Sequence, residues 1–319
     1  MNKSNVFKLL TEEEIKAIVS KHFNTNNFEF SLLTGGLFNT TYLLIINQQD
    51  KYVLRVGPVN RQLLLPFENN LMNSEKYFCE LCYNNGIPVA KIITCETEKN
   101  LIDRDYMIVE YIESVPLSSN DLTQHDKMKL YEETGQYVSK INSIVGNQFG
   151  RVSYILQGKG FSKWSEYLQF EIEEWAKTVF DYKIFTPSEL VLIKKVFVKY
   201  AKVLDEITCP HLVHADIWEG NILVSLNDGK YFVSAIIDGD RCIWGDADFE
   251  LASEWMINEW FIKGYGKTSV VNDNITIRRK LYMLIYNLID SYVCLVEYNN
   301  EQNSANNKNS ALTILTEFS

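Results

Sequence analysis

The spacing of apolar residues changes about one third of the way along the chain. Up to residue 112, short apolar runs such as FEFSLL, TTYLLII and KYVLRVG are separated by polar turns. Such runs predict antiparallel strands, because consecutive side chains of a strand face opposite sides of a sheet. From residue 113 onward, apolar residues recur every three or four positions, which predicts amphipathic helices. The pattern therefore predicts an α+β fold.

Two helices are also predicted in the first region. In TEEEIKAIV, Thr11 stands where a helix cap is expected, and LMNSEKYFCELCYNNG ends at Gly86 with Pro88 just beyond it. Further strands are expected over VAKIITCETEKN and RDYMIVEYI. We expect a small β-rich N-terminal lobe over residues 1–112, with one key helix, and a larger, mainly helical lobe over residues 113–319.

The second region is predicted to contain long helices over Lys127–Ser143, Lys163–Asp181 and Pro187–Ile207, and a hairpin around LNDGK. LYMLIYNLIDSYVCLV, which holds Asn287 and Asp290, is too short to cross a bilayer and is expected to form a buried helix. The polar stretch EQNSANNKNS near the end is expected to be mobile.

Composition narrows the range of partners. The 319 residues are 46% hydrophobic and 23% charged, with a formal net charge of −10. An acidic chain argues against nucleic acid as a partner and suits a cationic small molecule. Cys79 and Cys82 lie in a helical pattern with no second pair, which favours packing over metal binding. The N-terminus lacks a secretory apolar core, so a cytoplasmic protein without a membrane partner is expected.

The most informative segment is HADIWEGNILV, which begins at His214. Its spacing places Asp216 two residues after the histidine and Asn221 five residues later. Phosphoryl transfer needs a carboxylate beside the acceptor hydroxyl and oxygen ligands for Mg²⁺ near the phosphates. Asp216 suits the first role and Asn221 the second, while His214 would brace the loop. The same triple also suits a helix-cap histidine followed by an Asx turn.

A hairpin follows this segment, and its second strand ends in Asp238-Gly239. A carboxylate at a strand end is where a second metal ligand would arrive, although such an aspartate can also simply open a turn. The HADIWEGN segment followed by Asp238-Gly239, with one hairpin between them, favours a Mg²⁺ site made by Asn221 and Asp238.

Residues upstream would hold the nucleotide. Arg55 stands mid-strand among apolar neighbours, and a buried cation needs a partner, which Glu75 on the next helix can supply. This pair would hold the guanidinium against the α- and β-phosphates, unless Arg55 lies on a sheet surface. Gly35 and Gly36 allow backbone amides to approach phosphate oxygens, or they form a simple tight turn.

The strand MIVEYI reaches the boundary between the predicted lobes. There the backbone of Glu110 and Ile112 would pair with the edge of an adenine base. An ordinary strand end gives the same pattern, because backbone groups rather than side chains would make these contacts.

These segments together resemble a known family. The order of GGLFNTTY, YVLRV, Glu75, MIVEYI, HADIWEGNILV, IIDGD and WGDADFELA resembles that of the aminoglycoside phosphotransferases and choline-kinase-like small-molecule kinases, over nearly the whole chain. DIWEGNILV is also similar to fructosamine-kinase relatives. The resemblance implies a bilobal protein-kinase-like fold, with ATP, or GTP as an alternative, and Mg²⁺ as cofactors. It implies Asp216 as catalytic base, Asn221 and Asp238 as metal ligands, and Asn39 and Thr40 on the phosphate loop.

Two positions depart from the family pattern. The family loop usually reads His-Gly-Asp, whereas this chain has Ala215 in the middle, which would be strained if its φ were positive. Arg55 replaces the lysine of protein kinases, and its planar fork binds phosphate differently from an ammonium group.

The acceptor is expected to be a small molecule rather than a protein. Too few residues separate Asp238 from the helix expected near Phe249 for an activation segment that could hold a peptide. Ammonium groups of a substrate could be received by acidic residues, although an acidic residue on a helix is more often solvated. The acidic candidates are Asp240, Glu171, Glu174 and Glu254.

We therefore expect an ATP-dependent O-phosphotransferase that acts on a cationic antibiotic of the aminoglycoside type. A metabolic kinase for an amino alcohol, fructosamine, homoserine or sugar is the alternative among enzymes. A nucleotide-binding pseudokinase regulator is the alternative of another class. The presence of Asp216, Asn221 and Asp238 together argues against it, because a scaffold has no need of all three.

Overall fold

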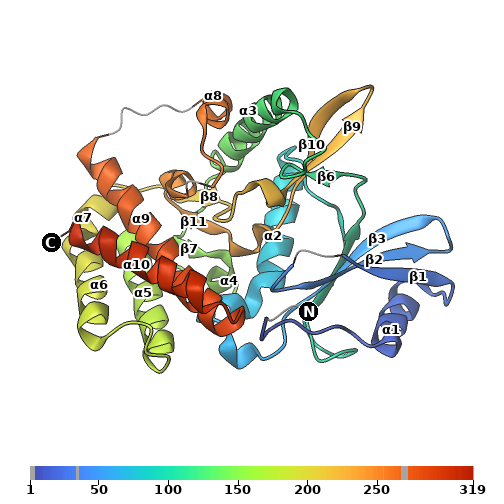
Figure 1. Cartoon of the computed structure of the whole chain (residues 1–319), viewed down its shortest axis with the longest axis horizontal. Helices are drawn as coiled ribbons and strands as arrows, with labels where there is room; N and C mark the ends of the chain where they lie inside the picture. Colours follow the sequence, from blue (N-terminus) through green and yellow to red (C-terminus); the bar gives the residue numbers. More distant parts are fainter. Residues whose placement is uncertain (1–3, 34–35, 254, 267–271, 319) are drawn as a thin grey trace.

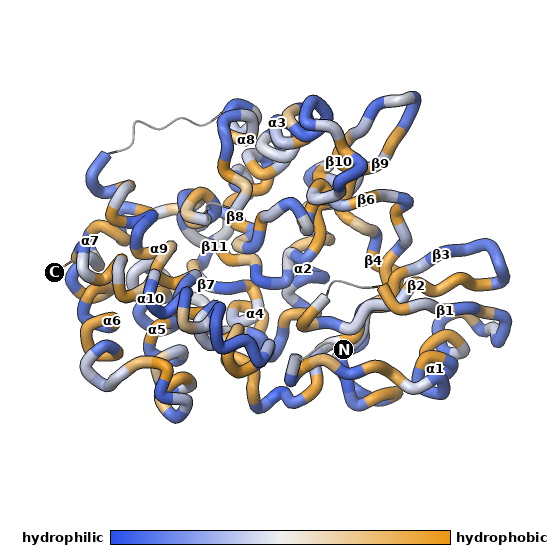
Figure 2. The backbone as a smooth tube through the Cα atoms, in the orientation of Figure 1, coloured by the Kyte–Doolittle hydropathy of each residue, from blue (hydrophilic) through white to orange (hydrophobic). Residues whose placement is uncertain are grey.

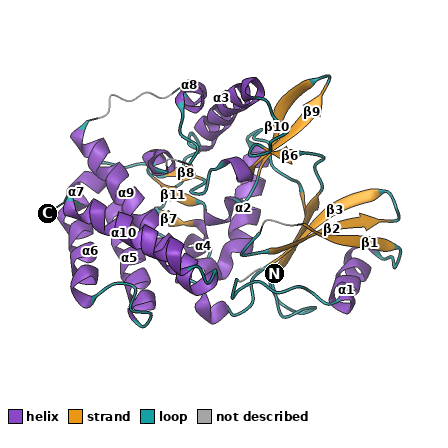
Figure 3. Ribbon diagram, viewed as in Figure 1, coloured by secondary structure: helices purple, strands orange, loops and turns teal. Residues whose placement is uncertain are grey.

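The structure is a computed structural model of the whole chain, and it describes all residues except 1–3, 34–35, 254, 267–271 and 319. A β-sheet occupies the N-terminal region, and most helices gather in the C-terminal region (Figure 1, Figure 3). This arrangement confirms the predicted α+β, kinase-like fold class. Within the described residues, every helix is too short or too polar to cross a lipid bilayer.

The elements follow one another along the chain with short connections. The α-helices are α1 (Glu12–Phe23), α2 (Leu71–Asn84), α3 (Gln124–Ile141), α4 (Val152–Ile155), α5 (Trp164–Phe180), α6 (Pro187–Lys199), α7 (Ala201–Leu204), α8 (Glu259–Tyr265), α9 (Asp273–Tyr292) and α10 (Glu301–Thr316). The strands are β1 (Phe28–Leu33), β2 (Thr40–Ile46), β3 (Asp50–Val56), β4 (Ile92–Glu96), β5 (Tyr106–Glu110), β6 (Val115–Pro116), β7 (Gly150–Arg151), β8 (His211–Val213), β9 (Ile222–Asn227), β10 (Lys230–Ile236) and β11 (Ile243–Gly245). Shorter helical segments near the site are η2 (Pro66–Asn70), η3 (Glu219–Asn221), η4 (Gly239–Arg241), η5 (Ala247–Ala252) and the π-helix η6 (Val293–Glu297).

Five antiparallel strands form the N-terminal sheet, in the order β1-β2-β3-β5-β4. α1 covers one face, where Ile15 and Ile18 pack against inward-facing residues of β2, β3 and β5. The predicted cap is present: the Thr11 hydroxyl accepts a hydrogen bond from the Glu14 amide, and the Glu14 carboxylate accepts one from the Thr11 amide. Local cap chemistry therefore starts this helix, and burial of its apolar stripe against the sheet stabilises it.

α2 lies between the sheet and the helical region (Figure 1). Its Met72 packs against Met107 and Val109 of β5, whereas Phe78 and Cys82 join the apolar cluster of the C-terminal region. The predicted helix over this segment is confirmed. Because α2 is packed from both sides, it carries Glu75 to the place where the two regions meet.

The largest apolar cluster lies in the C-terminal region, among α5, α6, α9 and α10. Trp164 and Trp175 belong to this core rather than to a ligand site, with their indole N–H groups bonded to Tyr282 (2.7 Å) and to the carbonyl of Leu288 (3.0 Å). The predicted helix over 187–207 is divided, because Tyr200 leaves helical geometry between α6 and α7. The apolar run that holds Asp290 is buried as α9, as predicted.

The expectation that the polar stretch EQNSANNKNS is mobile is wrong. It forms residues 301–310 of α10, the hydrophilic part of that helix (Figure 2). The Asn300 side chain caps the helix by accepting from the Asn303 amide, and Ser304 donates to the carbonyl of Ser291 at 2.6 Å. Further along, Ala311 and Leu315 are buried against the C-terminal core. Tertiary packing at the far end thus orders a segment whose composition alone favours disorder.

The N-terminal segment over residues 4–10, here called the N-terminal strap, contacts both regions. The Asn5 amide donates to the carbonyl of Glu297 at 2.6 Å, and its side chain donates to the carbonyl of Val296 at 2.8 Å. Further along the strap, the carbonyl of Lys8 accepts a hydrogen bond of 2.8 Å from Thr40. The strap therefore joins η6 directly to the start of β2.

Candidate active site

A cleft of about 800 Å³ lies where the sheet meets the helical region. The sheet contributes the loop after β1, the strands β2 and β3, and the end of β5. The helical region contributes the segment after β8, the end of β10, η4 and α9. The described candidates that line it are Gly36, Asn39, Arg55, Glu75, Glu110, Ile112, Asp216, Asn221, Asp238 and Asp240.

Asp216 and Asn221 face the cleft together. The side-chain amide of Asn221 donates to the carbonyl of Asp216 at 2.9 Å and to its carboxylate at 3.2 Å. This bond fixes the orientation of Asn221, so its side-chain oxygen is left for another ligand. Burial raises the pKa of Asp216 to about 8, while the guanidinium of Arg241 opposes the rise.

His214 braces this loop, as its position suggested. Its Nδ1 accepts a hydrogen bond of 3.2 Å from the Asp216 amide, so Nε2 carries the proton and donates to the carbonyl of Ile237 at 2.9 Å. Burial lowers the pKa of His214 to about 4, against the effect of that carbonyl, so the ring is neutral. One imidazole thus ties the backbone of Asp216 to the residue before Asp238.

A second buried group holds the same loop from behind. Both oxygens of Glu250, on η5, accept backbone amide protons, from His214 at 2.8 Å and from Ala215 at 3.2 Å. The φ angle of Ala215 is +66°, the left-handed region in which a side chain is strained. Alanine at position 215, where the family has glycine, therefore strains the backbone. The two hydrogen bonds to Glu250 help to offset the free-energy cost of this strain.

Arg55 forms the predicted pair with Glu75. Its guanidinium contacts the carboxylates of both Glu75 and Asp238, and only 11% of the Arg55 side chain is exposed. Burial opposes the charge, but Asp238 and then Glu75 outweigh burial and raise the pKa of Arg55. Two carboxylates from separate elements therefore hold the guanidinium at the centre of the cleft.

Only some of the residues predicted for the phosphate loop line the cleft. A Cβ added to Gly36 would lie 2.8 Å from the carbonyl oxygen of Asn39, so the loop is closely folded on itself. Gly35 falls outside the described residues. The expectation for Thr40 is not met, because its fully buried hydroxyl donates to Lys8 and accepts from Arg104. Thr41 lines the cleft instead, since neighbouring residues of β2 face opposite sides.

The end of β5 supplies the backbone that could receive a nucleotide base. Glu110 and Ile112 line the cleft on either side of Tyr111. The carboxylate of Glu110 accepts from the Lys91 amide at 2.9 Å, which turns this side chain toward β4. Apolar residues from both regions form the walls next to this segment: Val53, Ala90, Val109, Leu223 and Ile236.

Of the acidic substrate candidates that the structure describes, only Asp240 lies on the cleft wall. The expectation for Glu171 and Glu174 is wrong: neither lines the cleft, since both lie on α5 in the C-terminal region. Glu171 is buried against Arg151, and Glu174 forms an ion pair of 2.9 Å with Lys177. Glu254 falls outside the described residues. The charges and the helical spacing of these glutamates did not show which face of α5 packs against the C-terminal core.

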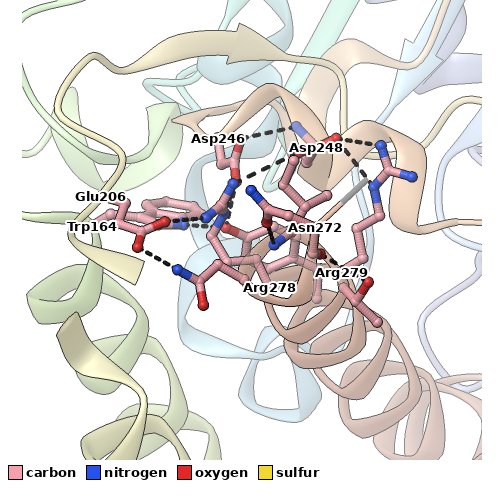
Figure 4. A network of polar contacts seen from close by, with 11 residues as sticks. Trp164, Glu206, Asp246, Asp248, Asn272, Arg278 and Arg279 are labelled. Carbon is pink, nitrogen blue, oxygen red and sulfur yellow. Dashed lines mark hydrogen bonds and ion pairs between the residues drawn. The ribbon is translucent and has the colours of Figure 1, made fainter. Parts of the chain in front are cut away.

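A polar network anchors η5 and the start of α9 to each other. Asp246 accepts from the Nε of Arg278 at 3.0 Å and from the hydroxyl of Tyr282 at 2.8 Å, and Arg278 also binds Glu206 (Figure 4). Asp248 accepts from Arg279 beside it (Figure 4). These ties fix the segment that carries Glu250 and the helix that ends near the cleft.

The cleft wall includes residues that the sequence analysis did not name as site residues, among them Trp218, Arg241, Asp290 and Tyr298. Trp218 stands inside the HADIWEGN segment and is 45% exposed, and its ring covers Gly220, where an added Cβ would approach it to 2.2 Å. A signal for Asp290 existed, since it is a charge within an otherwise apolar helical run. The order of these four residues in the sequence does not show that they meet at one cleft.

The wall can also hold a divalent cation. Asn221 offers a side-chain oxygen and Asp238 a carboxylate, and these oxygen donors suit Mg²⁺. Burial and then the like charge of Asp238 raise the pKa of Asp240 to about 7, a repulsion that a bound cation would relieve. In the described part, no three His, Cys, Asp or Glu side chains converge on one metal position. The donor set therefore fits an ion held largely by nucleotide phosphates.

Comparisons with known proteins agree with this arrangement. The Phosphotransferase enzyme family matches residues 29–267, and no curated protein sequence matches the chain. The chain resembles the solved complex of APH(2″)-IIa with streptomycin and ATP, with 16% identity, 98% of this chain and 99% of that chain covered, and a TM-score of 0.64. It also resembles a candidate fructosamine-3-kinase from Thermobifida fusca YX-ER1, with 15% identity, coverage of 95% and 98%, and a TM-score of 0.65.

The likeness to solved structures covers the whole architecture at low identity, and it establishes the fold. The family match spans most of the chain and contains the loop after β8, the end of β10 and the glycine-rich loop. The chain therefore belongs to the phosphotransferase enzyme family, as a phosphotransferase that acts on hydroxyl groups of small molecules.

Proposed function

We propose that this protein transfers the γ-phosphate of ATP, or of GTP, to a hydroxyl group of a small amine-bearing molecule. The observation that carries the proposal is the meeting of Asp216, Asn221 and Asp238 on the wall of one cleft. These residues come from separate elements, and only the fold brings them together. A turn or a helix cap would not require this convergence.

In the proposed reaction, Asp216 orients the acceptor hydroxyl and takes its proton. The acceptor oxygen bonds to the γ-phosphorus, the bond from that phosphorus to the β–γ bridging oxygen breaks, and ADP or GDP leaves. His214 holds the amide of Asp216 and Glu250 holds the two amides before it, so the carboxylate of Asp216 meets the acceptor in a fixed geometry. Arg55 would steady the phosphates from the sheet side.

Asn221 and Asp238 would hold Mg²⁺, which neutralises charge on the transferring phosphates when it is bound. The backbone from Glu110 to Ile112 would receive the base. We propose that residues 1–112 form a lobe that binds the nucleotide and that residues 113–319 form a catalytic lobe.

The acceptor end of the cleft supports an amine-bearing molecule. Asp290 and Trp218 both line the cleft, and a carboxylate and an aromatic surface are each groups that suit ammonium ions. Aminoglycoside-type antibiotics and amine-bearing metabolites such as fructosamines are the acceptor classes to compare, because similar folds are known with streptomycin and under the fructosamine-3-kinase name.

The test is acceptor-dependent ADP formation by the purified chain, screened over both classes with and without Mg²⁺. Asp216→Asn should lower kcat by about 10³-fold, in the range of general-base catalysis, while calorimetry shows unchanged nucleotide binding. Full turnover in Asp216→Asn would exclude the assigned role. Nucleotide binding without transfer to any acceptor would instead indicate a regulatory pseudokinase.

A further inference from the structure

Two side chains of opposite charge line the acceptor end of the cleft without pairing with each other. Arg241 ends η4, three residues after Asp238, and Asp290 lies near the end of α9. Both line the same cleft, and the charge of Arg241 acts on Asp290. Neighbouring opposite charges normally close into an ion pair unless each is held in place.

Arg241 is held from one end. Its Nη2 donates to Glu68 at 2.9 Å, and the side chain of Glu68 has no exposed surface. The guanidinium carbon lies 5.8 Å from the centre of the Phe67 ring, and 20% of the side chain remains exposed. Among the described residues, no acceptor receives its Nε or Nη1 protons. A guanidinium with N–H groups left over on a cleft wall suits a carboxylate or a phosphate.

Asp290 is a carboxylate without a partner in the described part of the chain, and it could bind a cationic group of a ligand. Its carboxylate forms neither a hydrogen bond nor an ion pair with any described residue, and its backbone carbonyl accepts from the Val293 amide at the end of α9. Burial raises the pKa of Asp290 to about 6, and Arg241 opposes the rise. A partly buried carboxylate without a partner is unfavourable, and an arriving cation would satisfy it.

The surroundings keep these two charges apart. Glu68 retains Arg241, and the network of Asp246 and Arg278 fixes the start of α9, the helix that carries Asp290. Because both backbones are anchored, the wall presents one cationic and one anionic group to a ligand. A molecule that carries both charges would satisfy both residues at once.

We propose that the acceptor is a hydroxyl-bearing zwitterion with an α-amino-acid head group. Its carboxylate binds Arg241, its ammonium group binds Asp290, and its hydroxyl is directed toward Asp216. This inference rests on the proposed phosphotransfer to a small molecule and narrows its acceptor class. A polycationic antibiotic fits less well, because its ammonium groups would meet the positive charge of Arg241 on the same wall.

The test compares acceptors that differ by one charge. ADP formation is measured with hydroxyl-bearing α-amino acids of increasing chain length, including homoserine. Each is compared with its amino alcohol, which lacks the carboxylate, and with its N-acetyl derivative, which lacks the ammonium group. Streptomycin serves as the polycation. For at least one chain length, kcat/KM of the zwitterion should exceed that of both derivatives by about tenfold or more, since one satisfied charge contributes at least this factor.

Matched variants assign each charge to its residue. Asp290→Asn should raise KM for the zwitterion about tenfold and leave KM for the N-acetyl derivative unchanged. Arg241→Lys, which keeps a cation beside Glu68, should raise KM for the zwitterion and not for the amino alcohol. Asp181→Asn, an exposed position at the end of α5, is the control for loss of one negative charge and should change neither value.

The possible results distinguish failure of the zwitterion assignment from failure of the proposed phosphotransferase function. Preference for streptomycin or an amino alcohol over every zwitterion would overturn the zwitterion assignment and leave the phosphotransferase proposal intact. An Arg241→Lys variant with equally reduced kcat for all acceptors would place Arg241 at the phosphates and would overturn its carboxylate role. Absence of acceptor-dependent ADP formation with every compound would overturn both proposals.

Discussion

Replacement of Glu250 by glutamine tests whether one buried carboxylate holds the catalytic loop. Glutamine keeps the shape of the side chain and one acceptor oxygen, but it turns an NH₂ group toward either the His214 or the Ala215 amide. One backbone N–H, buried with Glu250 at 1% exposure, is then left without an acceptor. A buried donor left without an acceptor costs about 1–3 kcal/mol, so we expect a loss of about 2–3 kcal/mol in the free energy of unfolding.

The effect has a defined dependence on pH. Burial raises the pKa of Glu250 to about 7, above the value of about 4.5 expected in the unfolded chain. The protonated form is thus preferred in the folded state, and this contribution to stability is complete below about pH 4.5 and is lost as pH rises through about 7. Glutamine does not titrate, so the gap between wild type and Glu250→Gln should be wider at pH 5.5 than at pH 8.

Thermal unfolding at both pH values measures the loss, which should lower Tm by about 3–5 °C for a chain of this size. Glu189→Gln is the control, because Glu189 caps α6 by accepting from the Thr186 amide and glutamine serves equally in that position. In steady-state assays, Glu250→Gln should also lower kcat, by up to about 100-fold, with KM for ATP little changed. An unchanged Tm and kcat, or an equal loss in the control, would refute the assigned role.

Four further substitutions probe the loop at Gly36, the strained residue Ala215 and the N-terminal strap. Gly36→Val should raise KM for the nucleotide about tenfold in steady-state kinetics, because the added Cβ, 2.8 Å from a carbonyl oxygen of the loop, displaces that loop; an unchanged KM would place the phosphates elsewhere. Ala215→Val should destabilise the protein by about 2–4 kcal/mol in urea unfolding, since a β-branched residue is strained at φ +66° and overfills a buried site. Ala215→Gly should change stability by less than about 1 kcal/mol, because relief of strain offsets the lost methyl group and the greater entropy of the unfolded chain. Asn5→Ala should cost about 1 kcal/mol in the same assay by removing the side-chain bond to Val296; no change would show that the strap is held by its backbone alone.

Local signals in the sequence predicted much of the fold. Thr11 placed the start of α1 correctly, and the turn in LNDGK placed the hairpin of β9 and β10, because caps and turns depend on residues within a few positions of each other. The segment with Asp216 and Asn221 was found for the same reason, since its spacing is itself local.

Features that depend on the third dimension could not be predicted in the same way. α10 is helical because of residues far along its own length and because of α9, although its first half has a disorder-like composition. A shift of one residue in β2 decides whether Thr40 or Thr41 faces the cleft. Arg241 and Asp290 lie about fifty residues apart in sequence, and no spacing rule relates them.

The N-terminal strap has a mechanical consequence for the cleft. The chain crosses between the sheet and the helical region through the segment after β5, and the strap makes a separate crossing through hydrogen bonds of Asn5 to η6. The strap therefore adds a tie beside the packing of α2 against both regions. Rotation that carries the start of β2 away from η6 would first have to break the hydrogen bonds of Asn5.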